Sequence, residues 1–268
     1  MKFKYTDFHV HTNWSLDIIE NGPKFEDYIS VAEKNRINLC FLDHYELYYI
    51  EKDKSNPFSN QNVYNYLEKI DQLKETYDFV LSGLEVDYYA DRETELQEFM
   101  DDLGNELDFI AGTIHEWIPG YPITLREKVI ELTNKIPVKQ IIDEFFGATE
   151  QLIHSGIFKN ICHIDTVFRY INENDIKPPK DCDISDERVI KLGLLCKEKK
   201  VSIEYNLSGF KFPINRAFPS KEVVSQLKQE GANFFVGSDS HSLDYFEETI
   251  PKLRKAHEFL NLNYKTKY

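Results

Sequence analysis

The sequence lacks the features of secreted and membrane proteins. It has only four cysteines in 268 residues, and none of them forms a Cys-x-x-Cys pair, so neither a disulfide framework nor a zinc ribbon is expected. No stretch approaches the roughly 18 apolar residues of a membrane span. The amino terminus has no apolar signal-peptide region. We therefore expect a cytoplasmic protein that does not bind a membrane.

Positive charge is also scarce. The chain has 32 Lys and Arg residues against 46 Asp and Glu residues, which gives a formal net charge of −14. A chain this acidic lacks the basic surface that binds nucleic acid. It can still bind a small anion where a local group of cations, such as metal ions, reverses the field. We therefore expect a small-molecule partner and no nucleic acid.

Short apolar segments alternate with helical patterns along the chain. The expected strands are Tyr5–Val10, Leu39–Asp43, Phe79–Glu85, Phe109–His115, Ile161–Asp165, Ser202–Asn206 and Phe234–Asp239. The expected helices are Phe25–Asn35, Val63–Tyr77, Glu93–Leu107, Leu243–Leu260 and three that begin near Pro137, Ser185 and Ser220. Such alternation predicts parallel strands with right-handed crossovers.

Two architectures fit this alternation, a closed barrel and an open doubly wound sheet. A glycine-rich loop after the first strand is typical of the open sheet, but here the sequence His9-Val10-His11-Thr12 stands at that place. The sequence also shows no internal repeat and no linker. We therefore predict an α/β barrel-like fold, with residues 1–268 forming a single domain.

Six of the eight histidines fall at or just after the carboxyl end of an expected strand. These are His9, His11, His44, His115, His163 and His241, and two acids, Glu85 and Asp239, occupy similar positions. In an α/β barrel the carboxyl ends of the strands meet on one face, where active sites form. One such histidine is more often a hydrogen-bonded core residue, but six together with two carboxylates indicate a metal centre. His154 and His257 fall in helices and are expected to be structural.

The motifs that carry these residues resemble those of a known family. They are Asp7-Phe-His9-Val-His11-Thr12, Phe41-Leu-Asp43-His44, Gly83-Leu-Glu85, Gly112-Thr-Ile-His115, His163-Ile-Asp165 and Gly237-Ser-Asp239-Ser-His241. In order and spacing they resemble the polymerase and histidinol phosphatase (PHP) family of metal-dependent phosphoesterases. The resemblance implies a distorted, TIM-like barrel of seven β/α units that holds two or three divalent ions, with Zn, Mn and Fe as the candidates.

The resemblance also implies a set of ligands for three ions. They are His9, His11 and Asp239 for the first ion, His115 and His163 with Glu85 as a bridge for the second, and His44, His241 and Asp17 for the third. Asp17 stands where some members of the family have another histidine. Asp7 and Asp43 precede expected ligands in the sequence. Both are candidates to orient the imidazole rings of those ligands.

Within the family the chain looks most like the short histidinol-phosphate phosphatases. This implies hydrolysis of L-histidinol phosphate to L-histidinol and phosphate, by attack of a metal-bound hydroxide, in histidine biosynthesis. The segments around Arg169 and Lys211 resemble those in which cations meet the phosphate, and Arg216 is a further candidate for substrate binding. Asp43 is the candidate catalytic acid. Two alternatives remain, a phosphodiesterase or exonuclease on small nucleotides and a noncatalytic metal-binding module.

Overall fold

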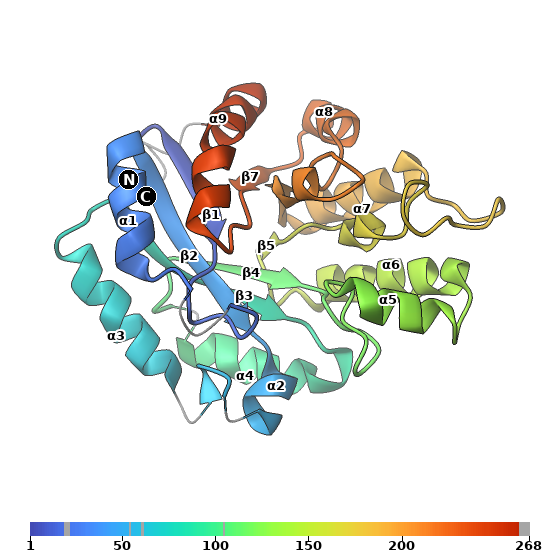
Figure 1. Cartoon of the computed structure of the whole chain (residues 1–268), viewed down its shortest axis with the longest axis horizontal. Helices are drawn as coiled ribbons and strands as arrows, with labels where there is room; N and C mark the ends of the chain where they lie inside the picture. Colours follow the sequence, from blue (N-terminus) through green and yellow to red (C-terminus); the bar gives the residue numbers. More distant parts are fainter. Residues whose placement is uncertain (19–21, 54, 60–61, 104, 263–268) are drawn as a thin grey trace. The chain divides into compact units, whose positions relative to one another are not determined.

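The computed structural model describes residues 1–18, 22–53, 55–59, 62–103 and 105–262. Seven strands form one sheet in the order β1 to β7, and helices alternate with the strands along the chain. The pairings β1–β2, β2–β3, β4–β5 and β5–β6 are all parallel. This topology confirms the predicted class, an α/β fold of seven β/α units (Figure 1).

The chain divides into two compact units, each made of discontinuous segments. The first unit contains Met1–Val86, Phe99–Ala111 and Phe235–Tyr268, and the second contains Asp87–Glu98 and Gly112–Phe234. This division does not test the prediction of one domain, which stays a prediction.

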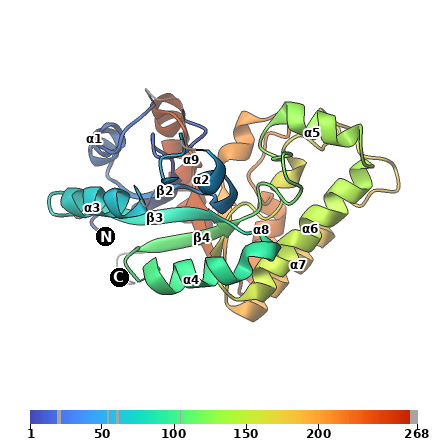
Figure 2. The ribbon, with the colours of Figure 1, turned by 90° about the horizontal axis from the view of Figure 1, so that it is seen from below.

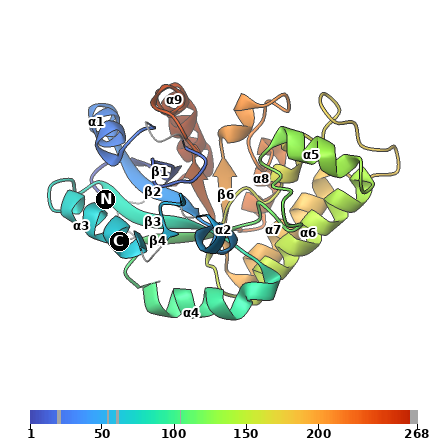
Figure 3. The same cartoon turned by 60° about the horizontal axis from the view of Figure 1, so that its bottom comes forward.

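The first unit is built on three neighbouring strands. They are β1 (Tyr5–Val10), β2 (Ile37–Tyr45) and β3 (Val80–Asp87, of which Asp87 belongs to the second unit). Nearly every residue of these strands is buried, as expected for parallel strands covered on both faces. The helices of this unit include α1 (Phe25–Asn35), α2 (Leu47–Lys52), α3 (Asn62–Lys74) and α9 (Leu243–Leu260). Helices α1 and α9 contact each other and lie side by side in Figure 3.

The end of β1 also meets the chain that follows β7 (Phe234–Gly237). Val10 and Ser240 form a parallel bridge, and the backbone N–H of Asp239 donates to the carbonyl of His9 over 2.8 Å. The N–H of His11 donates in turn to the carbonyl of Ser240 over 2.9 Å. Residues near positions 10 and 240 are therefore neighbours within the first unit.

The second unit contains two strands and most of the later helices. Its strands are β5 (Asn160–Ile161) and β6 (Ser202–Asn206), together with the end of β4 (Phe109–Thr113). Its helices are α5 (Arg126–Thr133), α6 (Val138–Ser155), α7 (Asp186–Lys199) and α8 (Lys221–Gln229), and α4 (Glu93–Leu103) begins in it. Helix α6 packs on α7 and α7 on α8, and Figure 2 shows α6 and α7 side by side.

Three short 3₁₀ helices complete the second unit. They are η2 (Ala90–Arg92), η3 (Thr166–Arg169) and η4 (Ser208–Lys211). Among the helices within the described ranges, none has both the length and the apolar character needed to cross a membrane.

Candidate metal centre

His9 and His11 present their imidazoles to the same side at the end of β1. Their ring centroids lie 4.7 Å apart, and both rings are fully buried. Residues two apart on an extended chain point to the same face, which is the arrangement that the sequence predicts. The Nε2 atoms of His9 and His11 lie 4.0 and 3.4 Å from Oδ1 of Asp239. These three residues therefore form a group of closely spaced ligand atoms.

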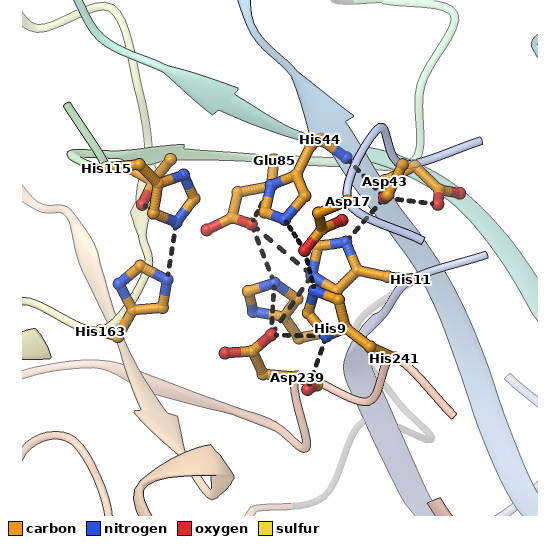
Figure 4. A network of polar contacts seen from close by, with 12 residues as sticks. His9, His11, Asp17, Asp43, His44, Glu85, His115, His163, Asp239 and His241 are labelled. Atoms are coloured by element: carbon orange, nitrogen blue, oxygen red, sulfur yellow. Dashed lines mark hydrogen bonds and ion pairs between the residues drawn. The ribbon is translucent and has the colours of Figure 1, made fainter. Parts of the chain in front are cut away.

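Glu85 lies among three imidazoles of the first unit. Its Oε2 atom is 3.2 Å from Nε2 of His9, 3.0 Å from Nδ1 of His44 and 3.6 Å from Nε2 of His11. The Glu85 side chain is buried, and Figure 4 shows its carboxylate directed at these rings. A buried carboxylate is stable only with compensating positive charge, from protonated imidazoles or from a cation.

His241 and Asp17 complete the group in the first unit. Nδ1 of His241 lies 3.4 Å from Oδ1 of Asp239, and its Nε2 lies 3.1 Å from Oδ2 of Asp17. Nε2 of His44 is 3.7 Å from the same Asp17 oxygen. Asp17 is about half-exposed, with 52% of its side chain accessible, so it stands at the solvent side of the group.

The charges in this group perturb one another. Although burial alone would raise it, the pKa of Asp239 lies well below its usual range because His9, His11 and His241 surround the carboxylate. Burial lowers the pKa of His11 well below its usual value, and neighbouring His241 and His44 act in the same direction. The group thus brings an ionised carboxylate at Asp239 next to a neutral imidazole at His11. Although burial alone would lower it, the pKa of His44 lies well above its usual value because Asp17 and Glu85 are close to the ring.

The residues of the first unit fit divalent metal ions. Nε2 of His11 is buried and makes no hydrogen bond, although it faces the carboxylates of Asp239 and Glu85. Imidazole nitrogens and carboxylate oxygens are the usual ligands of zinc, manganese and iron. His11, His44 and His241 form a second group of ligand atoms within 4.8 Å of one another. Divalent metal binding is therefore supported by the geometry as well as by the residue types.

The second unit holds the other two predicted histidine ligands. His115 follows β4 and His163 follows β5, and their Nε2 atoms lie 3.4 Å apart. Both residues are buried. Figure 4 shows the two rings facing each other. The predicted role of Glu85 as a bridge to this pair stays a prediction.

Two acids of the second unit orient these histidines. Asp87 accepts a hydrogen bond from the backbone N–H of His115 over 3.0 Å, and its other oxygen lies 3.3 Å from Nδ1 of the ring. Glu204 accepts from the backbone N–H of His163 over 3.0 Å. An acid at Nδ1 fixes the ring with Nε2 available to a metal. Asp87 is not among the residues predicted from the sequence, although its position two residues after Glu85 is a usable signal.

Two of the predicted ligands have unusual backbone conformations. Asp239 has φ of 55° and His163 has φ of 20°, both in the region that residues other than glycine rarely adopt. Such conformations cluster at functional sites, where the surrounding structure imposes them. At these two residues the surrounding structure imposes a less stable backbone conformation, which places the side chains at the site.

Asp43 and Asp7 bind backbone and hydroxyl groups. Asp43 accepts hydrogen bonds from the backbone N–H of Thr12 over 2.6 Å, from the Thr12 hydroxyl and from the Ser15 hydroxyl over 2.9 Å. Asp7 accepts from the backbone N–H groups of His9 and Ser238. Neither acid contacts an imidazole directly through these bonds. These contacts are those of an accepting carboxylate, whereas burial raises the pKa of Asp43. Its predicted role as the catalytic acid stays a prediction.

The three predicted substrate cations all lie in the second unit. Arg169 ends η3 and is buried, with its guanidinium 4.5 Å from the ring centroid of Phe212. Arg216 is half-buried and pairs with buried Asp165 over 2.9 Å. Lys211 ends η4 on the surface. The structure thus distinguishes a stacked arginine, a paired arginine and an exposed lysine.

Known proteins resemble this chain in sequence and in fold. No family model matches it. A candidate histidinol-phosphatase from Deinococcus radiodurans is 22% identical over 242 residues, which cover 88% of this chain and 85% of the relative.

Two solved structures share the fold. One is a candidate histidinol phosphatase from Listeria monocytogenes, with a TM-score of 0.77, 17% identity and coverage of 92% of this chain and 99% of that one. The other is a histidinol phosphate phosphatase from Lactococcus lactis in complex with zinc, L-histidinol and phosphate. It has a TM-score of 0.74, 20% identity and coverage of 97% and 93%. These similarities confirm the resemblance drawn from the motifs.

Proposed function

We propose that the protein is a metal-dependent phosphomonoesterase that hydrolyses L-histidinol phosphate to L-histidinol and phosphate. One observation carries this proposal. Every predicted ligand of the first unit lies within 4.0 Å of at least one other, although the residues come from positions 9 to 241 of the chain. The Deinococcus and Lactococcus relatives supply the substrate class.

His9, His11 and Asp239 would hold one ion, and His44, His241 and Asp17 a second within the same unit. His115 and His163 would hold a further ion. Bound divalent ions supply positive charge to a phosphate and lower the pKa of coordinated water towards about 7. Zinc is the ion of the Lactococcus structure, and the nitrogen and oxygen ligands of this chain suit zinc, manganese and iron alike.

The residues around the ligands would hold the site in shape. Asp87 orients His115, and Glu204 anchors the backbone of His163. Both acids are buried, so these bonds are shielded from water. Asp87 would keep the His115 ring in one tautomer and one orientation, whereas Glu204 would hold only the backbone position of His163 while substrate binds and product leaves.

Arg169 is the strongest candidate to bind the phosphate group. Its position over Phe212 fixes the plane of the guanidinium, which can then donate to two phosphate oxygens at once. Arg216 has its charge balanced by Asp165, so it contributes less net attraction. Lys211 would act as a mobile point charge at the surface.

A substrate panel tests the proposal. Metal-loaded protein should release inorganic phosphate from L-histidinol phosphate much faster than from phosphate diesters or nucleotides, as measured by initial rates. A preference for diesters would assign the site to a phosphodiesterase. Inactivity of the metal-loaded protein across the whole panel would indicate a noncatalytic metal-binding module.

A further inference from the structure

Ser15 lies buried in the loop after β1, between two of the predicted ligands. Its Oγ atom is 3.0 Å from Nδ1 of His11, 3.1 Å from the backbone nitrogen of His44 and 2.9 Å from Oδ1 of Asp43. Only 1% of Ser15 is exposed, so water does not compete for these contacts. Neither the motifs nor the comparisons single out this serine.

The chemistry of a hydroxyl group determines the direction of each bond. A serine hydroxyl has one hydrogen to donate and two lone pairs to accept with. The carboxylate of Asp43 can only accept, so the single Ser15 hydrogen points to Asp43. The two lone pairs then accept the N–H of His44 and the Nδ1–H of His11. The hydrogen and both lone pairs of the Ser15 hydroxyl therefore each form one hydrogen bond.

This assignment fixes the tautomer of His11. With its proton on Nδ1, the ring has its lone pair on Nε2, the atom that faces the carboxylates of Asp239 and Glu85. Nε2 is also the buried atom of this ring that makes no hydrogen bond. A neutral imidazole in this state is ready to bind a metal through Nε2.

We propose that Ser15 is a positioning residue of the metal centre. Through its hydroxyl, Ser15 links the carboxylate of Asp43 to the imidazole of His11. The same hydroxyl also holds the backbone N–H of His44 in place. At His115 the carboxylate of Asp87 approaches Nδ1 directly, whereas at His11 a serine stands between carboxylate and ring. The inference rests on the proposed function only in requiring that His11 binds a metal.

The test compares Ser15→Ala with a matched control, Ser82→Ala. Ser82 is also buried in the first unit, and its hydroxyl also donates to an aspartate, Asp108, over 3.1 Å, but among the described residues no histidine contacts this hydroxyl. Zinc affinity is measured for the wild-type protein and both variants by competition with a chelator. We expect Ser15→Ala to weaken zinc binding about 10- to 100-fold, as loss of a residue that orients a ligand does. Ser82→Ala should stay within about twofold of wild type, since no ligand depends on it.

A second measurement needs no variant. Nitrogen-15 NMR of the histidine rings in the zinc-loaded wild-type protein should show His11 protonated at Nδ1. A proton on Nε2 would overturn the proposal, and so would unchanged zinc affinity in Ser15→Ala. Failure of the proposed function would look different, because the wild-type protein would then bind zinc with this tautomer and yet not hydrolyse L-histidinol phosphate.

Discussion

His257 shows how a buried histidine can serve the fold without binding a metal. It lies in α9 with only 1% of its surface exposed, and its Nε2 is 2.6 Å from the carbonyl oxygen of Thr6 on β1. The neutral ring therefore donates a hydrogen bond that joins the helix to the strand. Burial lowers the pKa of His257 from 6.5 to about 4.

This lowered pKa predicts a loss of stability in acid. The unfolded chain binds a proton at His257 near pH 6.5 and the folded chain only near pH 4, so stability falls as the pH drops through this window. The loss should approach about 3 kcal/mol at pH 4. Urea denaturation across this range measures it in wild type and in His257→Gln, which keeps a donor but cannot be protonated.

The matched control for this experiment is His154→Gln. His154 is also helical but half-exposed on α6. His257→Gln should make the free energy of unfolding depend less on pH, whereas His154→Gln should leave that dependence unchanged. If the free energy of unfolding fell equally with pH in wild type and His257→Gln, the lowered pKa of His257 would not be the cause of the acid destabilisation.

Arg169 allows a comparison between two similar arginines. The guanidinium of Arg169 lies 4.5 Å from the Phe212 centroid, and that of Arg188 lies 4.5 Å from the Phe146 centroid. Only Arg169 belongs to a segment that resembles a phosphate-binding one. Arg169→Ala should lower kcat/KM about 10- to 100-fold, the effect of losing hydrogen bonds to a charged group.

Steady-state kinetics with L-histidinol phosphate make this comparison. Arg188→Ala should leave kcat/KM within about twofold of wild type, because it removes a similar ring contact without removing a predicted phosphate ligand. Similar kinetics for the two variants would show that Arg169 serves packing alone.

The sequence predicts ligands better than the residues that support them. Six histidines and two acids recur at strand ends, and this repetition distinguishes them from ordinary core residues. Asp87, at the end of β3, follows the same pattern, whereas Ser15 and Glu204 do not. Their hydrogen bonds to ligand residues depend on three-dimensional contacts that the sequence alone does not show. The ligand roles themselves stay predictions until metal is measured.

Among the elements, the sequence predicts the bounds of two strands and two helices. The bounds of β1, β6, α1 and α9 agree with those expected. The two helices are among the weaker of the expected helical patterns, and the two strands are short apolar segments. Ser220 also caps α8 as expected, accepting the backbone N–H of Val223.

Short elements are where the prediction fails. Helices α2 and α5, with 6 and 8 residues, are too short to show a convincing helical period. Strand β5 has only 2 residues, whereas a strand was expected over Ile161–Asp165. The backbone at His163 turns to φ of 20°, which ends extended geometry there.

Two helical glycines differ in what surrounds them. On α7, a Cβ added at Gly193 would clash with Cδ1 of Leu227, which is fully buried on α8. On α6, a Cβ added at Gly147 would meet nothing within 4 Å. Glycine at position 193 therefore permits the close packing of α7 on α8.

Alanine at these two positions should have opposite effects. Gly193→Ala should lower the free energy of unfolding by about 1–3 kcal/mol through overpacking. Gly147→Ala should raise it by about 0.5–1 kcal/mol, because alanine favours a helix interior. Urea denaturation measures both, and a stabilised Gly193→Ala would show that Leu227 can move aside.

At the scale of the molecule, the metal centre connects distant parts of the sequence. The predicted ligands of the first unit come from the ends of β1, β2 and β3, from the loop after β1 and from the segment after β7. The unfolded chain does not bring these residues together, so metal binding favours the folded state. Bound cations also reduce the electrostatic repulsion within this acidic chain, which has a net charge of −14.

Removing metal should therefore destabilise the protein. Zinc at 100 times its Kd adds about 2.7 kcal/mol to the free energy of unfolding, and excess chelator should remove that gain. Thermal unfolding measures the change as a lower Tm, which restored zinc should reverse. In His11→Ala the chelator should shift Tm less, and an equal shift would place the stabilising ion elsewhere.

The left-handed backbone at Asp239 has a consequence for laboratory evolution. Glycine tolerates φ of 55° better than aspartate does, so Asp239→Gly would relieve local strain and delete a carboxylate among three imidazoles. A library screened for heat resistance without metal would enrich glycine there, whereas a screen for turnover would retain the acid. The two selections would drive this one codon in opposite directions.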